Sequence, residues 1–302
     1  SVGFKLILLR LGMFRQAAKA PLAVANARGF ATAQQLGLRI RSVKNIKKIT
    51  SAMKMVAACK LRKSQENLDV MREFNKMTAI WPESKIENPQ NQLVIAMSGD
   101  KGLCGAVNSS IVRGARDYVN QCKENGVESQ LVIYGEKAKQ GLERLFGNQI
   151  KFSCAENGKL LPLEFNQTLE ITDFWTKQQF DSCTFFFQYF KSMIAYDTTK
   201  VFFTSFAEQE KDLSYFNDYE IEGNSDCLQN LDEFRKAVSL HYFFAENDTS
   251  TLSARMSAMD NSTKNAGEMI DKLTIILNRS RQAKITTELT EIISGAAAVE
   301  EG

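Results

Sequence analysis

The chain has 302 residues, of which 44% are hydrophobic and 24% charged, and these values are typical of one or two globular domains. Its longest apolar run falls far short of the roughly 20 residues that a helix needs to span a bilayer. The single His and the six scattered Cys, none of them in a C-x-x-C pair, argue against a zinc site. We interpret the cysteines as free thiols in a reducing compartment.

The net charge of +3 conceals an asymmetric distribution. The first 65 residues hold 14 of the 38 Lys and Arg and no acidic residue, so the remainder carries 24 basic against 35 acidic residues. A basic arm on an acidic body indicates a polyanionic contact surface at one end of the protein. A solvated face together with a targeting peptide is the alternative explanation for part of this charge.

The N-terminal segment has the composition of a mitochondrial transit peptide. From Met13 to Gln35 it contains Arg, Lys and many Ala but no acidic residue, and Arg28-Gly29-Phe30 resembles a matrix-processing site. We therefore expect residues 1–30 to be a transit peptide or an upstream extension. The alternative is a helical N-terminus that stays attached.

Residues 31–82 are predicted to form one long coiled-coil helix. From residue 36 to residue 81 there is no Pro and, after Gly37, no Gly, and Trp81-Pro82 should end the helix. Ile49 and Val56 are expected to widen its apolar stripe. Spacings of three and four residues define the predicted seam, which consists of Val43, Ile46, Thr50, Met53, Ala57, Lys60, Ser64, Asn67, Met71 and Phe74.

Between the two ends of the chain, residues 90–222 are predicted to form an α/β domain. Strands are expected at 92–98, 129–135 and, more weakly, 151–155, with helices near 108–125 and 136–146 between them. This alternation predicts a Rossmann-like parallel sheet with right-handed crossovers. Later β-rich runs at 182–190 and 200–207 predict two more strands, for which a hairpin is one arrangement.

A second coiled-coil helix is predicted over residues 226–299. Because one long helix enters the α/β domain and the other leaves it, the two should run antiparallel. The second is longer by about 25 residues, so its apolar end, residues 281–299, should project past its partner. Its predicted seam consists of Leu252, Met256, Met259, Thr263, Ala266, Ile270, Leu273, Leu277 and Ser280.

The loop SGDKGLCGAVNSS, residues 98–110, is the strongest candidate for chemistry. It follows a strand and precedes a helix, where glycine-rich loops bind phosphate. Its glycines are spaced G-x-x-G-x-x-G and no G-K-[ST] follows, so we interpret it as a tight strand-to-helix turn. His241 is expected to be packed, and we find no catalytic constellation. The basic run 44–63 has no aromatic residue for base stacking, so acidic protein loops fit it as well as nucleic acid does.

Both long helices resemble those of a known family. RIRSVKNIKKITSAMKMVAACKLRKSQ (39–65) and ARMSAMDNSTKNAGEMIDKLTIILNRSRQAKITTELTEIISGAAAV (254–299) closely resemble the terminal helices of the gamma subunit of rotary proton-translocating ATP synthases. The loop after the first strand resembles that family's S-D-R-G-L-C-G, with Gly99 added and Lys101 in place of Arg. The resemblance covers residues 36–299, and the cysteine-bearing insertion of chloroplast forms is absent.

The resemblance implies a shaft with no catalytic residue and no cofactor or metal. Its partners would be a hexamer of three alpha and three beta subunits, the delta and epsilon subunits and the membrane ring of c subunits, on the matrix side of the mitochondrial inner membrane. Beta-subunit contacts would involve Lys47, Lys48, Met53, Lys54, Arg255, Arg281, Gln282, Thr286 and Glu288. An apolar sleeve of the hexamer would receive a bearing tip formed by Ile292, Ile293, Gly295, Ala296, Ala297 and Ala298.

A non-rotary coiled-coil adaptor or tether with an α/β head is the rival interpretation. Such a protein would also need a partner for its apolar tip, but it does not explain the small and polar seam. A nucleotide-using enzyme is a more distant alternative, because no phosphate motif is intact.

Overall fold

The computed structural model describes residues 33–78, 89–155, 164–209 and 225–300. The predicted transit peptide and the predicted helix end at residue 81 lie outside these residues. Two compact units divide the chain: a terminal unit, Ser1–Lys47 with Asn265–Gly302, and a central unit, Lys48–Lys264. Helices α2 (Ala33–Thr78) and α7 (Ser225–Glu300) contribute to both units. Among the described helices, none is long and apolar enough to cross a membrane.

The central unit contains a five-stranded sheet in the order β3-β2-β1-β4-β5. Strands β1 (Asn91–Met97), β2 (Glu128–Tyr134), β3 (Ile150–Cys154) and β4 (Ser182–Phe190) are parallel, as the alternation of strands and helices predicts. Strand β5 (Tyr196–Thr204) pairs antiparallel with β4. The predicted hairpin is therefore confirmed, although β5 begins four residues before the predicted start at 200. Polar residues 197–200 lie on this edge strand, where water replaces an apolar neighbour.

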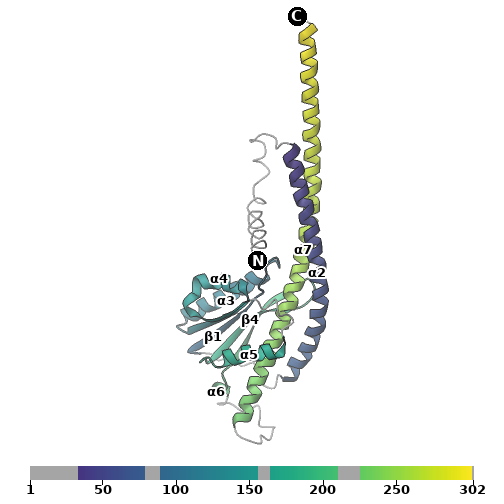
Figure 1. Ribbon diagram of the computed structural model, residues 1–302. Coiled ribbons are helices and arrows are strands. Elements are labelled where there is room, and N and C mark those ends of the chain that lie inside the picture. The colour runs from purple at the N-terminus through teal and green to yellow at the C-terminus, as the bar shows by residue number, and fades with distance from the viewer. Residues whose placement is uncertain (1–32, 79–88, 156–163, 210–224, 301–302) are drawn as a thin grey trace. The chain divides into compact units, whose positions relative to one another are not determined.

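Helices cover both faces of the sheet (Figure 1). On one face, α3 (Val107–Glu124) and α4 (Glu136–Phe146) pack on alternate strand residues such as Val94 and Ile133. On the other, α5 (Phe165–Thr176) and the first part of α7 pack on Leu93, Ile95 and Tyr134. The three central strands β1, β2 and β4 are buried on both sides over most of their length, which explains their nearly continuous apolar runs. Short helices η2 (Gly147–Gln149) and α6 (Phe206–Gln209) complete the unit.

Within the central unit, α2 and α7 run antiparallel, as predicted. Their hydrogen-bonded pairs move in opposite directions along the two helices: Thr50 with Thr263 at 2.8 Å, Ser64 with Thr249 at 2.8 Å and Ser239 with Asn75 at 3.2 Å. The predicted α7 seam is confirmed, since Leu252, Met259 and Ala266 are buried and the other predicted positions are half-buried.

The predicted α2 seam is only partly right. Thr50 and Ala57 are buried, but Ile49 and Val56 are 58% and 57% exposed and do not widen the stripe. Beyond Ala57, the buried residues are Leu61 and Leu68 rather than the predicted Lys60 and Asn67, which are exposed and half-buried. The reason is tertiary: this part of α2 also packs on the sheet, where Leu68 contacts Phe190 of β4 and Ala245 of α7.

The terminal unit contains the first part of α2, with Leu36, Ile40 and Val43 buried, and the last part of α7. Within this unit α7 continues past the start of α2 (Figure 1). Every described side chain from Arg281 to Val299 is exposed. The expected projecting end is therefore confirmed.

Candidate functional site

The projecting end of α7 carries an apolar stripe that the described residues do not cover. Ile285, Leu289, Ile292, Ile293 and Val299 are 55%, 56%, 68%, 59% and 81% exposed. Large exposed apolar surfaces of this kind usually mark a contact with another molecule. Of the predicted tip residues, Ile292, Ile293, Gly295, Ala296 and Ala297 all lie on this exposed helix, while the Ala298 side chain lies outside the described part.

Polar groups on the same stretch are largely satisfied within the helix. The hydroxyls of Thr286, Thr287 and Thr290 each donate to the carbonyl four residues earlier, at 2.9, 3.0 and 2.8 Å. Glu288 pairs with Lys284 at 3.5 Å. The threonines thus need no hydrogen-bond acceptor from a partner, and the surface offers mainly methyl groups and small side chains. Arg281 and Gln282, at the start of this stretch, are exposed.

The other predicted contact residues fall in two groups. Lys47 belongs to the terminal unit, as do Arg281, Gln282, Thr286 and Glu288. In the central unit, Lys48 is exposed and Met53 is half-buried on α2, while Arg255 lies half-buried on α7. The residues that the family resemblance predicts to contact a beta subunit are therefore distributed over both compact units.

Lys54 is engaged within the coil. Its Nζ lies 2.6 Å from Asp260 Oδ1, and Lys264 Nζ lies 2.8 Å from the other oxygen of the same carboxylate. Hydrogen bonds from Lys264 and Lys54 lower the pKa of Asp260 to about 2. An ion pair between α2 and α7 is not visible in the sequence, because the two partners are 206 residues apart.

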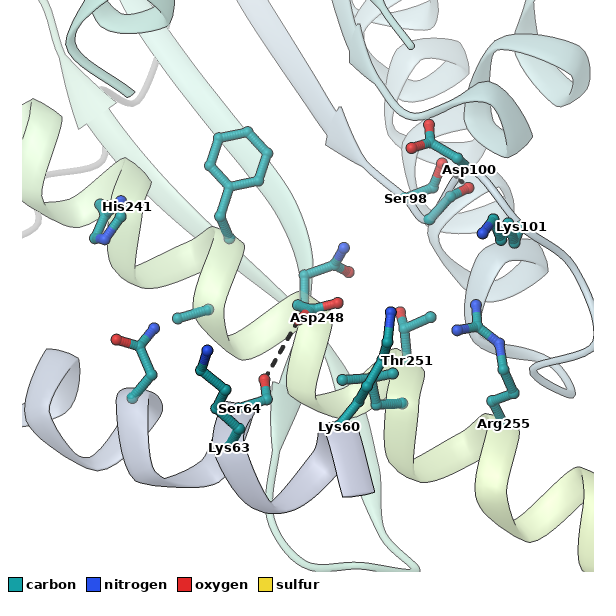
Figure 2. A pocket seen from close by; sticks show the side chains of 16 residues that line it. Lys60, Lys63, Ser64, Ser98, Asp100, Lys101, His241, Asp248, Thr251 and Arg255 are labelled. Carbon is teal, nitrogen blue, oxygen red and sulfur yellow. Dashed lines mark hydrogen bonds between the residues drawn. The ribbon is translucent and has the colours of Figure 1, made fainter. Parts of the chain in front are cut away.

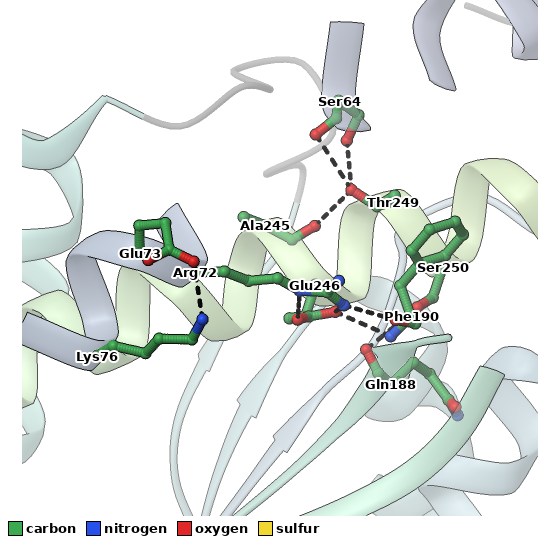
Figure 3. Close-up of polar contacts among 10 residues, drawn as sticks. All are labelled: Ser64, Arg72, Glu73, Lys76, Gln188, Phe190, Ala245, Glu246, Thr249 and Ser250. Atoms are coloured by element: carbon green, nitrogen blue, oxygen red, sulfur yellow. Dashed lines mark hydrogen bonds and ion pairs between the residues drawn. The ribbon is translucent and has the colours of Figure 1, made fainter. Parts of the chain in front are cut away.

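A partly buried ion pair joins the coil to the sheet (Figure 3). Arg72 of α2 donates to both oxygens of Glu246 of α7, at 2.8 and 3.1 Å, and to the Phe190 carbonyl at 2.5 Å. The Glu246 side chain is fully buried and also accepts the Phe190 backbone N–H at 2.8 Å. Because one carboxylate binds both a helix and a strand end, the network fixes α2, α7 and β4 to one another. Sequence reasoning missed these residues, and no local motif marks them.

Small polar residues of α7 continue this junction toward the β4–β5 hairpin. Ser250 donates to the Gln188 carbonyl at 3.2 Å, and Ser253 donates to the Met193 carbonyl at 2.6 Å. Thr249 donates to the Ala245 carbonyl at 2.8 Å as well as meeting Ser64 (Figure 3). Ser250 and Ser253 are therefore hydrogen-bonding partners for the β4–β5 hairpin and Thr249 for α2, which explains why polar residues occupy these positions instead of Leu and Ile.

The loop after β1 is a capping structure, as predicted for a tight turn. Ser98 Oγ accepts the Ala138 backbone N–H at 2.8 Å, and Asp100 accepts that of Glu136 at 3.2 Å. Asn108 closes the loop, because its side chain accepts from Gly99 N at 3.0 Å and donates to the Lys101 carbonyl at 3.3 Å. The polar side chains of this loop are thus used to cap the start of α4 and to close the loop itself.

His241 is packed, as expected. Its Nδ1 lies 2.9 Å from Thr168 Oγ1 of α5, and its ring meets Phe165 edge-on at 5.7 Å. Burial lowers its pKa. The imidazole is consequently neutral near pH 7 and serves the contact between α5 and α7.

Comparisons with known proteins agree on one family. A family model described as ATP synthase matches residues 32–299. The gamma subunit of the mitochondrial ATP synthase F(1) complex from Rattus norvegicus is 37% identical over 277 residues, which are 89% of this chain and 100% of that protein. The mitochondrial ATP synthase subunit gamma from Arabidopsis thaliana is 41% identical over 273 residues, covering 87% of this chain and 84% of that one.

Solved structures share the fold. A chain in the central stalk and c-ring of the Tetrahymena thermophila mitochondrial ATP synthase aligns with a TM-score of 0.60 and 28% identity, covering 70% of this chain and 98% of that chain. In the Euglena gracilis mitochondrial ATP synthase, a chain aligns with a TM-score of 0.76 and 18% identity, covering 91% and 96%. A family match over almost the whole chain, together with relatives of this identity and coverage, shows that this chain belongs to the ATP synthase gamma subunit family.

Proposed function

We propose that this chain is the central-stalk subunit of a mitochondrial ATP synthase. In this role it is a rotor shaft that couples proton flow through the membrane sector to ATP synthesis, and catalysis takes place on other subunits. The observation that carries the proposal is the exposed helical stretch 281–299, whose apolar stripe has no cover among the described residues. A hexamer of alpha and beta subunits with an apolar sleeve at its centre would provide that cover.

The surface chemistry of the stretch suits a contact that must change partners. Small side chains such as Gly295, Ala296 and Ala297 offer no directional bonds, and the threonine hydroxyls are already satisfied within the helix. A turning helix with this surface meets successive partners without breaking strong hydrogen bonds. Arg281 and Gln282 differ, since charge-assisted bonds from this pair to a beta subunit would be strong enough to define preferred angles.

Torque also has to pass between the coil and the α/β domain. The junction of Arg72, Glu246 and Phe190 is suited to this, because it is buried, multiply hydrogen-bonded and shared by two helices and a strand. Charged networks of this kind have one preferred geometry and resist sliding, unlike a purely apolar contact. The α/β domain would then turn together with the coil rather than slip on it.

Partners follow from this role. The alpha and beta subunits would surround the coil, and the ring of c subunits would carry the α/β domain at the membrane. We further propose contacts with the delta and epsilon subunits at the base and a position on the matrix side of the inner membrane. Lys47, Lys48, Met53, Lys54 and Arg255 remain our candidates for contact with beta, with Lys54 shared between that contact and Asp260.

A photo-crosslinking experiment tests the proposal. A photoreactive residue placed at Ile293 in the intact complex should form products with alpha or beta subunits, whereas the same probe at Leu145, which is 60% exposed on α4, should not. A tip probe that reacts only with this chain's own α/β domain, or only with water, would reject the shaft assignment. Capture of a single non-ATPase partner in equimolar amount would favour the adaptor interpretation.

A further inference from the structure

A cavity of about 360 Å³ lies in the central unit between α2, α7 and the loop after β1 (Figure 2). This volume is within the range of small-molecule sites. Of the residues that line it, only Arg255 is also a candidate for contact with beta, so the rotor role does not explain the cavity.

The lining is cationic. Lys60 and Lys63 come from α2, Lys101 from the loop after β1 and Arg255 from α7, and they approach the same space from three directions (Figure 2). Two carboxylates share the lining: Asp100, which accepts the Glu136 backbone N–H, and Asp248, which accepts the Ser64 hydroxyl at 3.4 Å. Four cations against two anions leave a net charge of +2 around the cavity, counting His241 as neutral.

Two buried polar atoms in the lining have no hydrogen-bond partner among the described residues: Asn247 Oδ1 and Thr251 Oγ1. Their residues are only 6% and 4% exposed, although both border the cavity. Buried polar atoms in proteins are nearly always paired, so such a pair facing one cavity indicates a missing partner there. The Asn247 oxygen requires a donor, while the Thr251 hydroxyl either donates or accepts.

The remaining wall is apolar. Phe244 and Leu252 are 7% and 5% exposed, and Ala245 lies between them on the same helix. An inorganic ion would leave this wall uncovered. A molecule with both a carbon skeleton and an anionic group would contact the cations, the two unpartnered polar atoms and the apolar wall.

We propose that this cavity binds a small phosphate ester. The cations Lys101 and Arg255, with Lys60 and Lys63 at the mouth, would hold the phosphate; Asn247 and Thr251 would bind hydroxyl or amino groups of the organic part. This site differs from a glycine-rich phosphate loop, because side chains rather than backbone amides supply the donors. The inference is independent of the rotor role, which would stand if the cavity held only water.

Isothermal titration of the full chain with AMP, ribose 5-phosphate and inorganic phosphate tests the proposal. We expect both esters to bind, with affinity at least about tenfold above that of inorganic phosphate. Lys101→Gln and Arg255→Gln should each weaken ester binding about tenfold, since each removes one charge-assisted contact. Asp248→Asn should strengthen it, because a negative charge leaves the lining. Such a gain would not arise from a damaged fold.

Arg62→Gln is the matched control, because Arg62 is an exposed cation on the same helix, beside Lys63, and does not line the cavity. It should leave ester affinity within about twofold of the parent chain. Equal binding of inorganic phosphate would overturn the assignment of an ester. Equal losses in Arg62→Gln and Lys101→Gln would show general charge attraction, and no ester binding up to about 10 mM would exclude the site. Circular dichroism of each variant checks that the chain is folded.

Discussion

Single residues at the coil–sheet junction combine charge, burial and hydrogen bonding. The carboxylate of Glu246 is fully buried and would be costly without Arg72 and the Phe190 amide. Asp248, two residues later, is in the opposite situation, because its main neighbour is the Ser64 hydroxyl and burial raises its pKa to about 6. We therefore expect neutral substitutions of these two α7 carboxylates to change the free energy of unfolding in opposite directions.

Replacing Arg72 by Met should lower the free energy of unfolding of the central unit by about 3–5 kcal/mol, since Glu246 would keep a buried charge without its partner. Urea unfolding followed by circular dichroism measures the change. Lys76→Met, which removes an exposed pair with Glu73, should cost less than about 1 kcal/mol. Adding Glu246→Gln to Arg72→Met should recover part of the loss, and a further drop in stability would contradict this explanation.

Asp248→Asn should stabilise the chain at neutral pH. The Asp248 carboxyl binds its proton more tightly in the folded chain than in the unfolded one, where its pKa is near 3.8, so stability falls as pH rises from about 4 to about 6. The variant lacks this penalty and should be more stable by about 1–2 kcal/mol at pH 7.5, with partial solvent access reducing the full effect. Urea titrations at several pH values should show the difference disappearing near pH 4. A constant difference would contradict the assignment.

Whole elements in this chain are shaped by what they pack against. Helix α2 follows its predicted seam up to Ala57 and then buries Leu61 and Leu68, because the sheet becomes a second neighbour there. The connection from β2 to α4 is constrained in the same way by the loop after β1. Its Gly135 has φ of 95°, and a Cβ at this position would lie 2.1 Å from the Ser98 carbonyl oxygen.

Gly135→Ala should therefore destabilise the central unit strongly, by about 3–5 kcal/mol, because strain of the left-handed backbone adds to a backbone clash. Gly126→Ala is the matched comparison: φ there is 73°, but no atom lies within 4 Å of the added Cβ. It should cost only the backbone strain, about 1–2 kcal/mol. Thermal unfolding of both variants measures the contrast. Equal losses would show that Ser98 moves aside and that the close approach is not important.

At the scale of the whole molecule, the chain separates a folded core from a surface built for other chains. The central unit buries its sheet on both faces, whereas the stretch 281–299 is exposed throughout its described side chains. The fold of the central unit should therefore not depend on the stretch 281–299. Removing the exposed stretch should affect assembly without unfolding the rest.

Truncation after Arg281 provides this test. The melting temperature of the isolated chain should change by less than about 2 °C, since the removed residues bury little apolar area. Torque in single-molecule rotation of a reconstituted complex, and the yield of that complex, should both fall. Loss of the folded central unit would contradict the separation of roles, and normal rotation would show that the tip is dispensable.

Met53→Lys tests the contact with beta. Met53 is half-buried on α2, next to Lys54, so a Lys there adds a further cation at the proposed contact and should stiffen it. Proton-coupled ATP synthesis should fall several-fold more than ATP hydrolysis, because only synthesis depends on faithful transfer of torque. Both activities are measured in reconstituted vesicles. Equal losses of both activities would count against placing Met53 at the contact with beta. Lys76→Met is the control, because Lys76 lies far along the same helix, and it should leave both activities unchanged.

The sequence by itself determined the two long helices, their antiparallel direction, the projecting apolar end and the parallel sheet. The helices, the strands and the apolar end follow from residue patterns that can be read along one helix or strand. The antiparallel direction and the parallel sheet follow from the order in which the chain connects these elements. The helix α5 was missed, because its run of Thr, Phe and Trp has no clear helical period and its capping pair, Glu164 and Gln167, stands apart from other signals.

Only the tertiary structure decided which residues join the coil to the sheet. It also decided that Leu61 and Leu68 are the buried residues of α2 beyond Ala57, and that the loop after β1 caps α4. Arg72 and Glu246 are 174 residues apart, and each looks like an ordinary surface charge on its own helix. Their pairing depends on the relative placement of three elements, which no local pattern encodes. The cavity arises in the same way, since its cations come from two helices and a loop that are brought together only by folding.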